Sequence, residues 1–151
     1  MAVCVKEYTL FRENEIRPLY AENGWESYLR KADLLENAYA HSLKILAAYD
    51  GDKLVGIIRA VGDGVSILYI QDLLVLPVRQ HQGIGRQLLK AMLDCYPDVN
   101  QTVLLTDDEE NTVSFYRDSG FQKVEKAGCV SFIRLHSCYQ SLNPERADFP
   151  E

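Results

Sequence analysis

The stretch from Ile67 to Leu89 constrains the fold of this 151-residue chain more than any other part of the sequence. It opens with an apolar run that is too dense for a strand with one solvent-facing side and is interrupted only by Gln71 and Asp72. Pro77 ends the run, and after a polar loop apolar residues recur at helical spacing, at Ile84, Leu88, Leu89, Met92 and Leu93. This order predicts a buried strand, a tight loop and an amphipathic helix.

The loop between the strand and the helix carries Gly83 and Gly85, one residue apart. Such a loop can direct several backbone N–H groups toward one point, where the positive end of the helix dipole also lies. Because glycine has no Cβ, a phosphate can approach its backbone closely. The loop lacks the Gly-Lys-Ser/Thr ending of a P-loop and the third glycine of the dinucleotide fingerprint. The sequence therefore predicts an anion-binding loop of another kind.

Two motifs in register extend this interpretation. Leu73-Leu-Val-Leu-Pro77 followed by Gln80-His-Gln-Gly-Ile-Gly-Arg86 resembles the acetyl-CoA motif of the GNAT N-acetyltransferase superfamily, Gln/Arg-x-x-Gly-x-Gly/Ala. About thirty residues later, Ser114-Phe-Tyr-Arg-Asp-Ser-Gly-Phe121 matches the Phe-Tyr-x-x-x-Gly-Phe pattern of the same family. The resemblance covers roughly residues 40–135 and implies acetyl-CoA as co-substrate, with no metal.

The resemblance assigns most cofactor binding to the backbone. Leu73, Leu74 and Val75 would present N–H and C=O groups to the pantetheine arm and the acetyl carbonyl, and the loop would surround the pyrophosphate. The loop residues so assigned are Gln80, His81, Gln82, Gly83, Ile84, Gly85 and Arg86. Family members commonly carry an asparagine seven residues before the motif tyrosine; here that position is Glu109, with Asn111 nearby, and the role is transferred to neither.

Tyr116 and Asp72 are the candidate catalytic residues. Tyr116 matches the family tyrosine thought to protonate the leaving thiolate, and a phenol carries its proton at neutral pH; its alternative role is an aromatic core anchor. A carboxylate inside the apolar run is costly unless it is paired, hydrated or at a break in the strand. Asp72 is therefore either the general base or anchor for the substrate ammonium, or a structural aspartate at a β-bulge.

The acceptor is expected to be a small-molecule amine. The string from Asp72 to Gly85 is close to that of aralkylamine and serotonin acetyltransferases, which favours a small amine or polyamine over a protein. Trp25, Tyr28 and Tyr39 could line the pocket for this amine or simply pack in the core.

Neither motif contains a cysteine that could form an acyl-enzyme, so direct transfer in a ternary complex is expected. A protein or peptide N-acetyltransferase and a non-catalytic acyl-CoA-binding module remain alternatives.

The expected fold is α/β, a GNAT-like mixed and mostly antiparallel sheet flanked by helices, with splayed central parallel strands. Asp50-Gly51-Asp52 and Gly62-Asp63-Gly64 supply hairpin turns. Pro18 and Gly24 should divide the helical pattern between residues 12 and 37 into two short helices. The expected strands are Val3–Leu10, Leu43–Tyr49, Lys53–Val61, Val65–Leu76, Thr102–Thr106, Phe121–Glu125 and Cys129–Leu135, and the other helices are Gly83–Tyr96 and Glu109–Ser119.

Composition and length limit which other classes of protein this chain can belong to. A formal net charge of −6 gives no electrostatic support for a nucleic-acid partner. No apolar run approaches the length of a membrane span, and the four scattered cysteines are expected as small core residues of a cytoplasmic protein without a metal site. The length suits one acetyltransferase domain over residues 1–139 with a flexible tail over residues 140–151, and a homodimer is possible.

Overall fold

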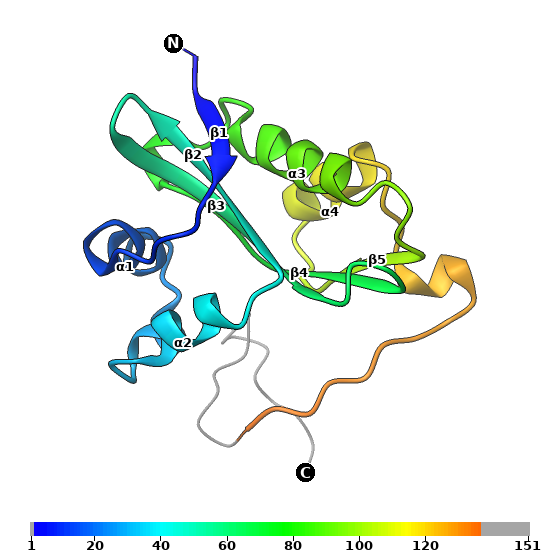
Figure 1. Ribbon diagram of the computed structural model, residues 1–151. Coiled ribbons are helices and arrows are strands. Elements are labelled where there is room, and N and C mark those ends of the chain that lie inside the picture. The colour runs from blue at the N-terminus through cyan, green and yellow to red at the C-terminus, as the bar shows by residue number, and fades with distance from the viewer. Residues whose placement is uncertain (1, 137–151) are drawn as a thin grey trace. The chain divides into compact units, whose positions relative to one another are not determined.

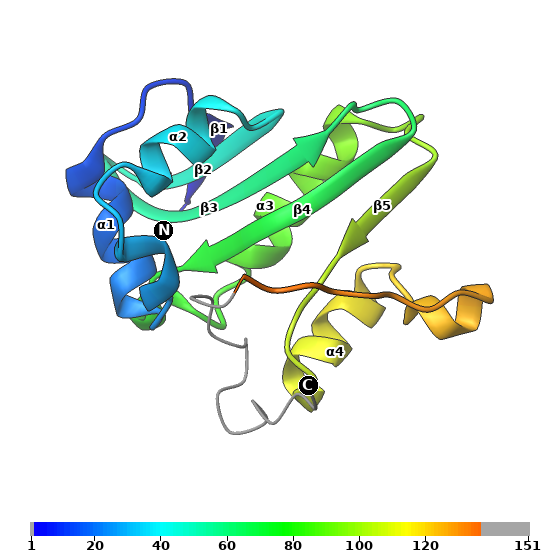
Figure 2. The same cartoon turned by 90° about the horizontal axis from the view of Figure 1, so that it is seen from below.

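The computed structural model describes residues 2–136 (Figures 1 and 2). The chain divides into two compact units, Met1–Leu105 and Thr106–Glu151. The predicted tail, residues 140–151, lies outside the described residues, as does Cys138.

The first unit is built on one five-stranded sheet in the order β1-β2-β3-β4-β5. The first four strands pair antiparallel, and β5 pairs parallel with β4 (Figure 2). This confirms the expected mixed, mostly antiparallel α/β architecture. The parallel ladder ends at the pair Ile70–Leu104, so β5 does not pair with the rest of β4, which runs on to Val75. The strands are β1 (Cys4–Glu7), β2 (Lys44–Asp50), β3 (Lys53–Gly62), β4 (Ile67–Val75) and β5 (Gln101–Leu104).

Helices cover both faces of this sheet. The longest, α3, packs on one face, and α1 and α2 lie over the other (Figure 1). The prediction that Pro18 breaks the first helix was wrong, because α1 continues through it. The N–H that proline lacks would bond to the carbonyl of Asn14, an exposed residue that water can reach. The helices of this unit are α1 (Glu13–Glu22), η1 (Glu26–Leu29), α2 (Leu34–Ala40), η2 (Pro77–Arg79) and α3 (Ile84–Cys95).

Strand β3 is the centre of the core, and every residue from Leu54 to Ala60 is buried. Gly56 sets how closely α3 approaches the strand. A Cβ there would lie 3.0 Å from the Leu74 carbonyl oxygen and 3.1 Å from Cδ1 of Leu88. The missing side chain therefore lets the first turns of α3 rest directly on the sheet.

A β-bulge on β4 decides which way Asp72 points. Arg59 pairs with Asp72 but the next residue of β3, Ala60, pairs with Ile70, so Gln71 is the extra residue. Because side chains alternate along a strand, one inserted residue reverses the faces beyond it. Asp72 thus shares a face with Arg59, toward the helices α1 and α2, and not with Ile70.

The second unit contains α4 (Glu110–Asp118) and η3 (Val124–Ala127). The two strands predicted over Phe121–Glu125 and Cys129–Leu135 were wrong, since no residue from 121 to 136 is in a strand. The first became a 3₁₀ turn closed by Gly128 at φ +80°. The second is extended but unpaired, because a strand forms only where a neighbour completes its hydrogen-bonded ladder.

The cysteines also differ from expectation. Cys4, Cys95 and Cys129 are free and exposed, so these three are not the small core residues that were predicted. Among residues 2–136, no helix is both long enough and apolar enough to span a membrane.

Candidate active site

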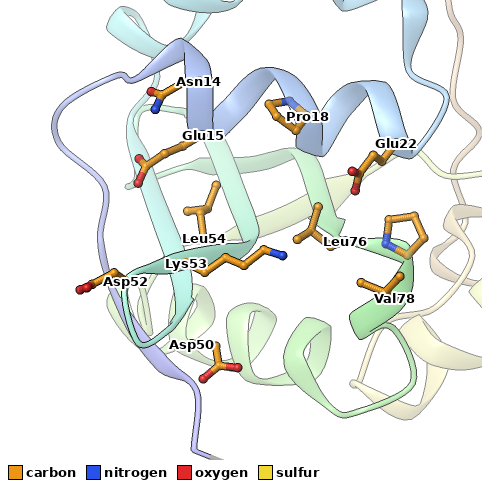
Figure 3. A pocket seen from close by; sticks show the side chains of 11 residues that line it. Asn14, Glu15, Pro18, Glu22, Asp50, Asp52, Lys53, Leu54, Leu76 and Val78 are labelled. Carbon is orange, nitrogen blue, oxygen red and sulfur yellow. The ribbon is translucent and has the colours of Figure 1, made fainter.

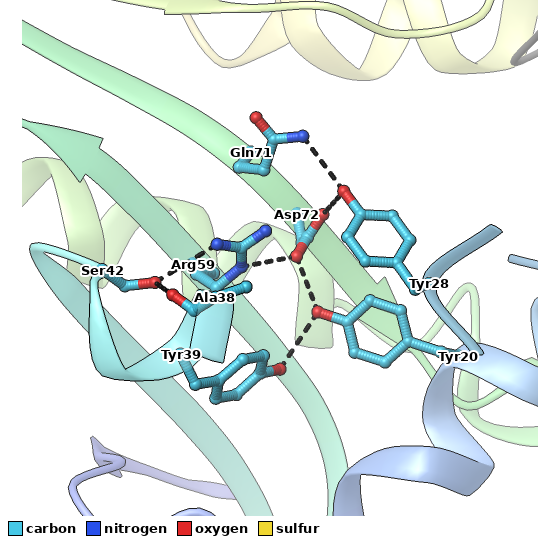
Figure 4. A network of polar contacts seen from close by, with 8 residues as sticks. All are labelled: Tyr20, Tyr28, Ala38, Tyr39, Ser42, Arg59, Gln71 and Asp72. Carbon is cyan, nitrogen blue, oxygen red and sulfur yellow. Dashed lines mark hydrogen bonds and ion pairs between the residues drawn. The ribbon is translucent and has the colours of Figure 1, made fainter. Parts of the chain in front are cut away.

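Asp72 is the centre of a buried polar network (Figure 4). Its side chain is 0% exposed and accepts three hydrogen bonds. Oδ2 receives them from Arg59 Nε at 2.7 Å and from the Tyr20 hydroxyl at 2.6 Å, and Oδ1 receives one from the Tyr28 hydroxyl at 2.8 Å. The cost of burying this carboxylate is offset by an opposite charge and two phenol donors.

The network extends outward on both sides of Asp72. Arg59 also donates from Nη1 to the hydroxyl of Ser42 at 3.2 Å, and the Tyr20 and Tyr39 hydroxyls lie 3.1 Å apart. Burial and then the charge of Asp72 raise the pKa of Tyr20 and of Tyr28 above their ordinary values. Burial opposes the charge on Arg59, yet Asp72 holds the pKa of Arg59 above its ordinary range. The phenols are therefore neutral donors and the arginine is a cation.

Aromatic rings surround one side of this network. Trp25 stacks on Tyr28 with ring centroids 5.7 Å apart and an interplanar angle of 24°, and Tyr20 lies 5.1 Å from Tyr28. Trp25 and Tyr28 are half-buried, so part of each ring reaches the surface. Tyr39 is only 6% exposed and belongs to the core. Of the three predicted pocket residues, two lie where a ligand could touch them.

The end of β4 presents a partly free backbone edge. Leu76 N–H donates to the Val55 carbonyl of β3, and the Leu74 carbonyl also faces β3 at Gly56. Because backbone groups alternate in direction along a strand, those of Leu73 and Val75 point away from β3. Beyond Ile70 no residue of β5 pairs with this edge. Of residues 73–75, Leu73 and Val75 are therefore the ones whose backbone groups face that side, although the Val75 carbonyl already accepts side-chain hydrogen bonds.

Two side chains reach the Val75 carbonyl. Asn23 Nδ2 donates to it at 3.1 Å and Gln80 Nε2 at 3.2 Å, while Gln80 Nε2 also lies 3.2 Å from Asn23 Oδ1. The structure thus places the predicted loop residue Gln80 against β4 and the end of α1. Sequence reasoning missed Asn23, because an asparagine at a helix end has many ordinary roles.

The loop before α3, predicted to bind an anion, contains two residues in the left-handed conformation. His81 has φ +63°, rare for a residue with a Cβ, and Gly83 has φ +84° at the start of the helix. Left-handed residues in such a turn point successive N–H groups into one concavity. No side chain of residues 2–136 caps α3. Arg86 lies exposed in its first turn, and Gln82 and Gly85 complete the loop with Ile84 buried beneath it.

Arg79 ties this loop to the sheet, and sequence reasoning missed it. Its Nη1 donates at 2.7 Å to Oδ2 of Asp50, the last residue of β2, and its Nε donates to Gln82 at 3.1 Å. Both members of the ion pair are about one fifth exposed. Arg79 stands one residue before the recognised motif, so only the spatial arrangement connects it with the loop.

Tyr116 lies on α4 in the second unit. Its ring makes edge contacts with Phe115 at 5.0 Å and Phe121 at 5.8 Å. Burial, assisted by the charge of Asp107, raises the pKa of Tyr116 to about 12. The phenol therefore carries a proton at neutral pH, as a general acid must.

An open cavity of about 900 Å³ lies between α1, the β2–β3 turn and the end of β4 (Figure 3). Four carboxylates line it against a single lysine, Lys53: Glu15, Glu22, Asp50 and Asp52. None of the predicted site residues lines this cavity. Among the described residues, no cluster of His, Cys, Asp or Glu could hold a metal ion.

The chain is similar to known proteins both in sequence and in fold. A family model described as an acetyltransferase (GNAT) domain matches residues 7–138. A GNAT-family acetyltransferase from Streptococcus pneumoniae is 38% identical, with a TM-score of 0.81 over 90% of this chain and 99% of that chain. A GNAT-family acetyltransferase from Elizabethkingia anophelis with acetyl-CoA bound has a TM-score of 0.62 over 80% of this chain and 76% of that chain; at 17% identity it supports the fold alone.

Among curated proteins, the probable acetyltransferase TAP2 of Glycine max is 30% identical over 112 residues, covering 67% of this chain and 44% of that protein. The chain spans about half or less of the length of the first curated relatives that it matches. The family model, by contrast, covers nearly all of the described residues, and the Streptococcus pneumoniae structure is matched along almost its whole length. The chain therefore belongs to the GNAT acetyltransferase family.

Proposed function

We propose that this chain is an N-acetyltransferase that transfers an acetyl group from acetyl-CoA to a primary amine by direct transfer in a ternary complex. The observation that carries the proposal is that the part of β4 beyond its pairing with β5 leads along the chain to the left-handed loop that opens α3. An extended pantetheine arm fits the first and a diphosphate fits the second. The structure of the same fold from Elizabethkingia anophelis is named as having acetyl-CoA bound, which is the ligand proposed here.

In this proposal the backbone of Leu73 and Val75 aligns the thioester, and the loop over residues 80–86 holds the pyrophosphate. The N–H groups of the first turn of α3 have no partner inside the helix, so they are free to donate to phosphate oxygens. Arg86 adds a positive charge beside them. Gly83 supplies the conformation that turns these groups inward.

The reaction needs a proton donor and a group that binds the amine. The amine nitrogen attacks the thioester carbonyl, the C–S bond breaks, and the amine loses one proton while the thiolate gains one. We assign the proton donor to Tyr116, whose pKa of about 12 keeps the phenol protonated. We assign the amine side to Asp72 and the groups bonded to it.

The acceptor proposed here is a small amine or a polyamine. Support comes from the half-buried rings of Trp25 and Tyr28 beside a buried carboxylate, since ring faces and phenol oxygens both attract an ammonium group. The proposal includes one catalytic domain over residues 1–139 in a cytoplasmic protein, with a homodimer as its assembly. A protein or peptide acceptor is the competing outcome of the test.

Thermal unfolding with and without acetyl-CoA tests the cofactor, and thiol release from acetyl-CoA tests the reaction. A ligand at 100 times its Kd should stabilise the native state by about 2.7 kcal/mol. Thiol release should then depend on an added amine, with 2-phenylethylamine, spermidine and a lysine-bearing peptide as the panel. Stabilisation without release for any amine would favour a non-catalytic acyl-CoA-binding module, and no stabilisation would refute the proposal.

A further inference from the structure

We infer that the phenol oxygen of Tyr28 is the atom that accepts a hydrogen bond from the acceptor amine, and that Asp72 acts only through it, as a positioning residue. This inference rests on the proposed function and names the amine-contacting group within the same site. It replaces direct contact between Asp72 and the amine with contact through a phenol.

Asp72 itself is closed to a ligand. It is 1% exposed, Oδ2 already accepts from Arg59 and Tyr20, and Oδ1 accepts from Tyr28. An amine could reach it only by displacing one of these donors. Loss of the ion pair with Arg59 would also leave the buried guanidinium without its counter-charge.

Tyr28, in contrast to Asp72, can still accept a hydrogen bond from a ligand. A carboxylate can only accept, so the hydroxyl proton of Tyr28 is committed to Asp72 Oδ1. The lone pairs of the phenol oxygen are what remain for other groups. Gln71, the exposed bulge residue, already donates its amide N–H to this oxygen at 3.0 Å. An N–H donor can therefore reach the phenol oxygen from the solvent side.

Gln71 marks the position of the amine. Its amide hydrogen bond is exposed and belongs to a flexible side chain, so an incoming ammonium or amine can replace it at little cost. Trp25 stacks on the Tyr28 ring and limits the directions from which a ligand can enter. The bulge also places this oxygen beside residues 71 and 72, directly before Leu73, where the thioester is proposed to lie.

Tyr28 orients the amine but does not deprotonate it. Burial and the charge of Asp72 raise the pKa of Tyr28 above its ordinary value, so the phenol stays protonated at every pH used for assay. Tyr28 keeps its own proton and Asp72 is closed to the amine, so neither takes the proton of the ammonium, which leaves to solvent before attack. The pH dependence of kcat/KM should therefore follow the basicity of the amine and not that of a group on the protein.

The test compares Tyr28→Phe with Tyr49→Phe in the full chain. Tyr49 is a matched control, because it is also half-buried and its hydroxyl contacts a carboxylate, that of Glu15, at 3.4 Å. Calorimetry measures the Kd of 2-phenylethylamine for protein saturated with coenzyme A, and kinetics measures its KM. We expect Tyr28→Phe to weaken amine binding by about 10- to 100-fold, the range for a hydrogen bond to a charged donor.

The Kd of acetyl-CoA should stay within about twofold of wild type in both variants, and Tyr49→Phe should leave the amine Kd unchanged. Gln71→Ala should strengthen amine binding by a few fold, because it removes the competing donor. If Tyr28→Phe binds the amine as wild type does, or if Gln71→Ala weakens binding, the inference is overturned. A structural role for Tyr28 would lower the thermal midpoint without changing the amine Kd selectively.

A second readout uses 2-phenylethylamine and its less basic β,β-difluoro analogue. The acidic limb of the kcat/KM profile should shift with the basicity of the amine; a limb at the same pH for both amines would mean that a protein group takes the proton, against the inference. Failure of the proposed function is separate, because it appears as absence of acetyl-CoA binding or thiol release in wild type. If wild type binds acetyl-CoA but gives no heat with either amine, the inference fails while the cofactor assignment remains.

Discussion

Arg59 Nε donates to Asp72 Oδ2 at 2.7 Å, and the two side chains are 6% and 0% exposed. They come from neighbouring strands and face each other because the bulge at Gln71 turns Asp72 toward the helices. A buried pair of this kind adds little net stability over an apolar pair, but either charge left alone is costly. Its main effect is to hold the carboxylate in one place for the two phenols bonded to it.

The first prediction concerns this pair. Arg59→Met and Asp72→Asn should each lower the free energy of unfolding by about 3–5 kcal/mol, since each leaves a buried polar group without its partner. The double variant should lose less than the sum, by about 1–3 kcal/mol. Urea unfolding of the four proteins measures this coupling.

The control for that cycle is the surface pair of Lys44 and Glu7, whose charged atoms are 3.6 Å apart and partly exposed. Lys44→Met should cost less than about 1 kcal/mol. Strict additivity of Arg59→Met and Asp72→Asn would show that the two residues do not stabilise each other in solution.

The sequence predicted the segments whose signal is local. The apolar run, the proline and the two glycines were enough for β4, the loop and α3, within two residues at most of their ends. The carboxylate in the run indicated a bulge, and the register shift lies one residue from Asp72. Each of these features depends on the preferences of residues that are close in the chain.

The features that the sequence did not predict depend on contacts between segments that are distant in the chain. Nothing in the sequence joins Tyr20, Tyr28 and Arg59 to Asp72, since they lie 13 to 52 residues away from it. The predicted last strand, Cys129–Leu135, has apolar residues but no neighbour to pair with in the described chain. A high strand propensity alone does not supply a neighbouring strand to pair with.

The second prediction tests Arg79 as the link that positions the loop. Arg79→Gln should raise the Kd of acetyl-CoA by about two- to tenfold, because it frees Gln82 and the rest of the loop from the turn at Asp50. Lys90→Gln is the control, since Lys90 forms an ion pair of the same 2.7 Å length with Asp94 on the exposed side of α3. Equal affinities in the two variants would exclude a positioning role.

The third prediction concerns Gly83, which has φ +84° and open space around the position of a Cβ. Gly83→Ala should cost about 1–2 kcal/mol in stability through backbone conformation alone, and it should weaken acetyl-CoA binding by turning the N–H groups away. Gly128 has φ +80° and equally open space, so Gly128→Ala should have the same cost in stability. Unchanged acetyl-CoA affinity in Gly83→Ala, measured by calorimetry, would remove the loop from the cofactor site.

The fourth prediction concerns Tyr116 as the acid. Tyr116→Phe keeps the ring contacts with Phe115 and Phe121 but removes the proton that the leaving thiolate would take. We expect kcat to fall by about 100-fold or more, while the Kd of acetyl-CoA changes by less than about threefold.

Because burial raises the pKa of Tyr116 to about 12, the phenol is still protonated at pH 10. Deprotonation of the phenol should therefore lower activity only above pH 10. The kcat of the wild type should show no decline between pH 8 and 10. Steady-state kinetics across this range, with Tyr49→Phe beside Tyr116→Phe, checks both expectations. A decline centred near pH 9, or a Tyr116→Phe variant with the kcat of wild type, would assign the proton to another group.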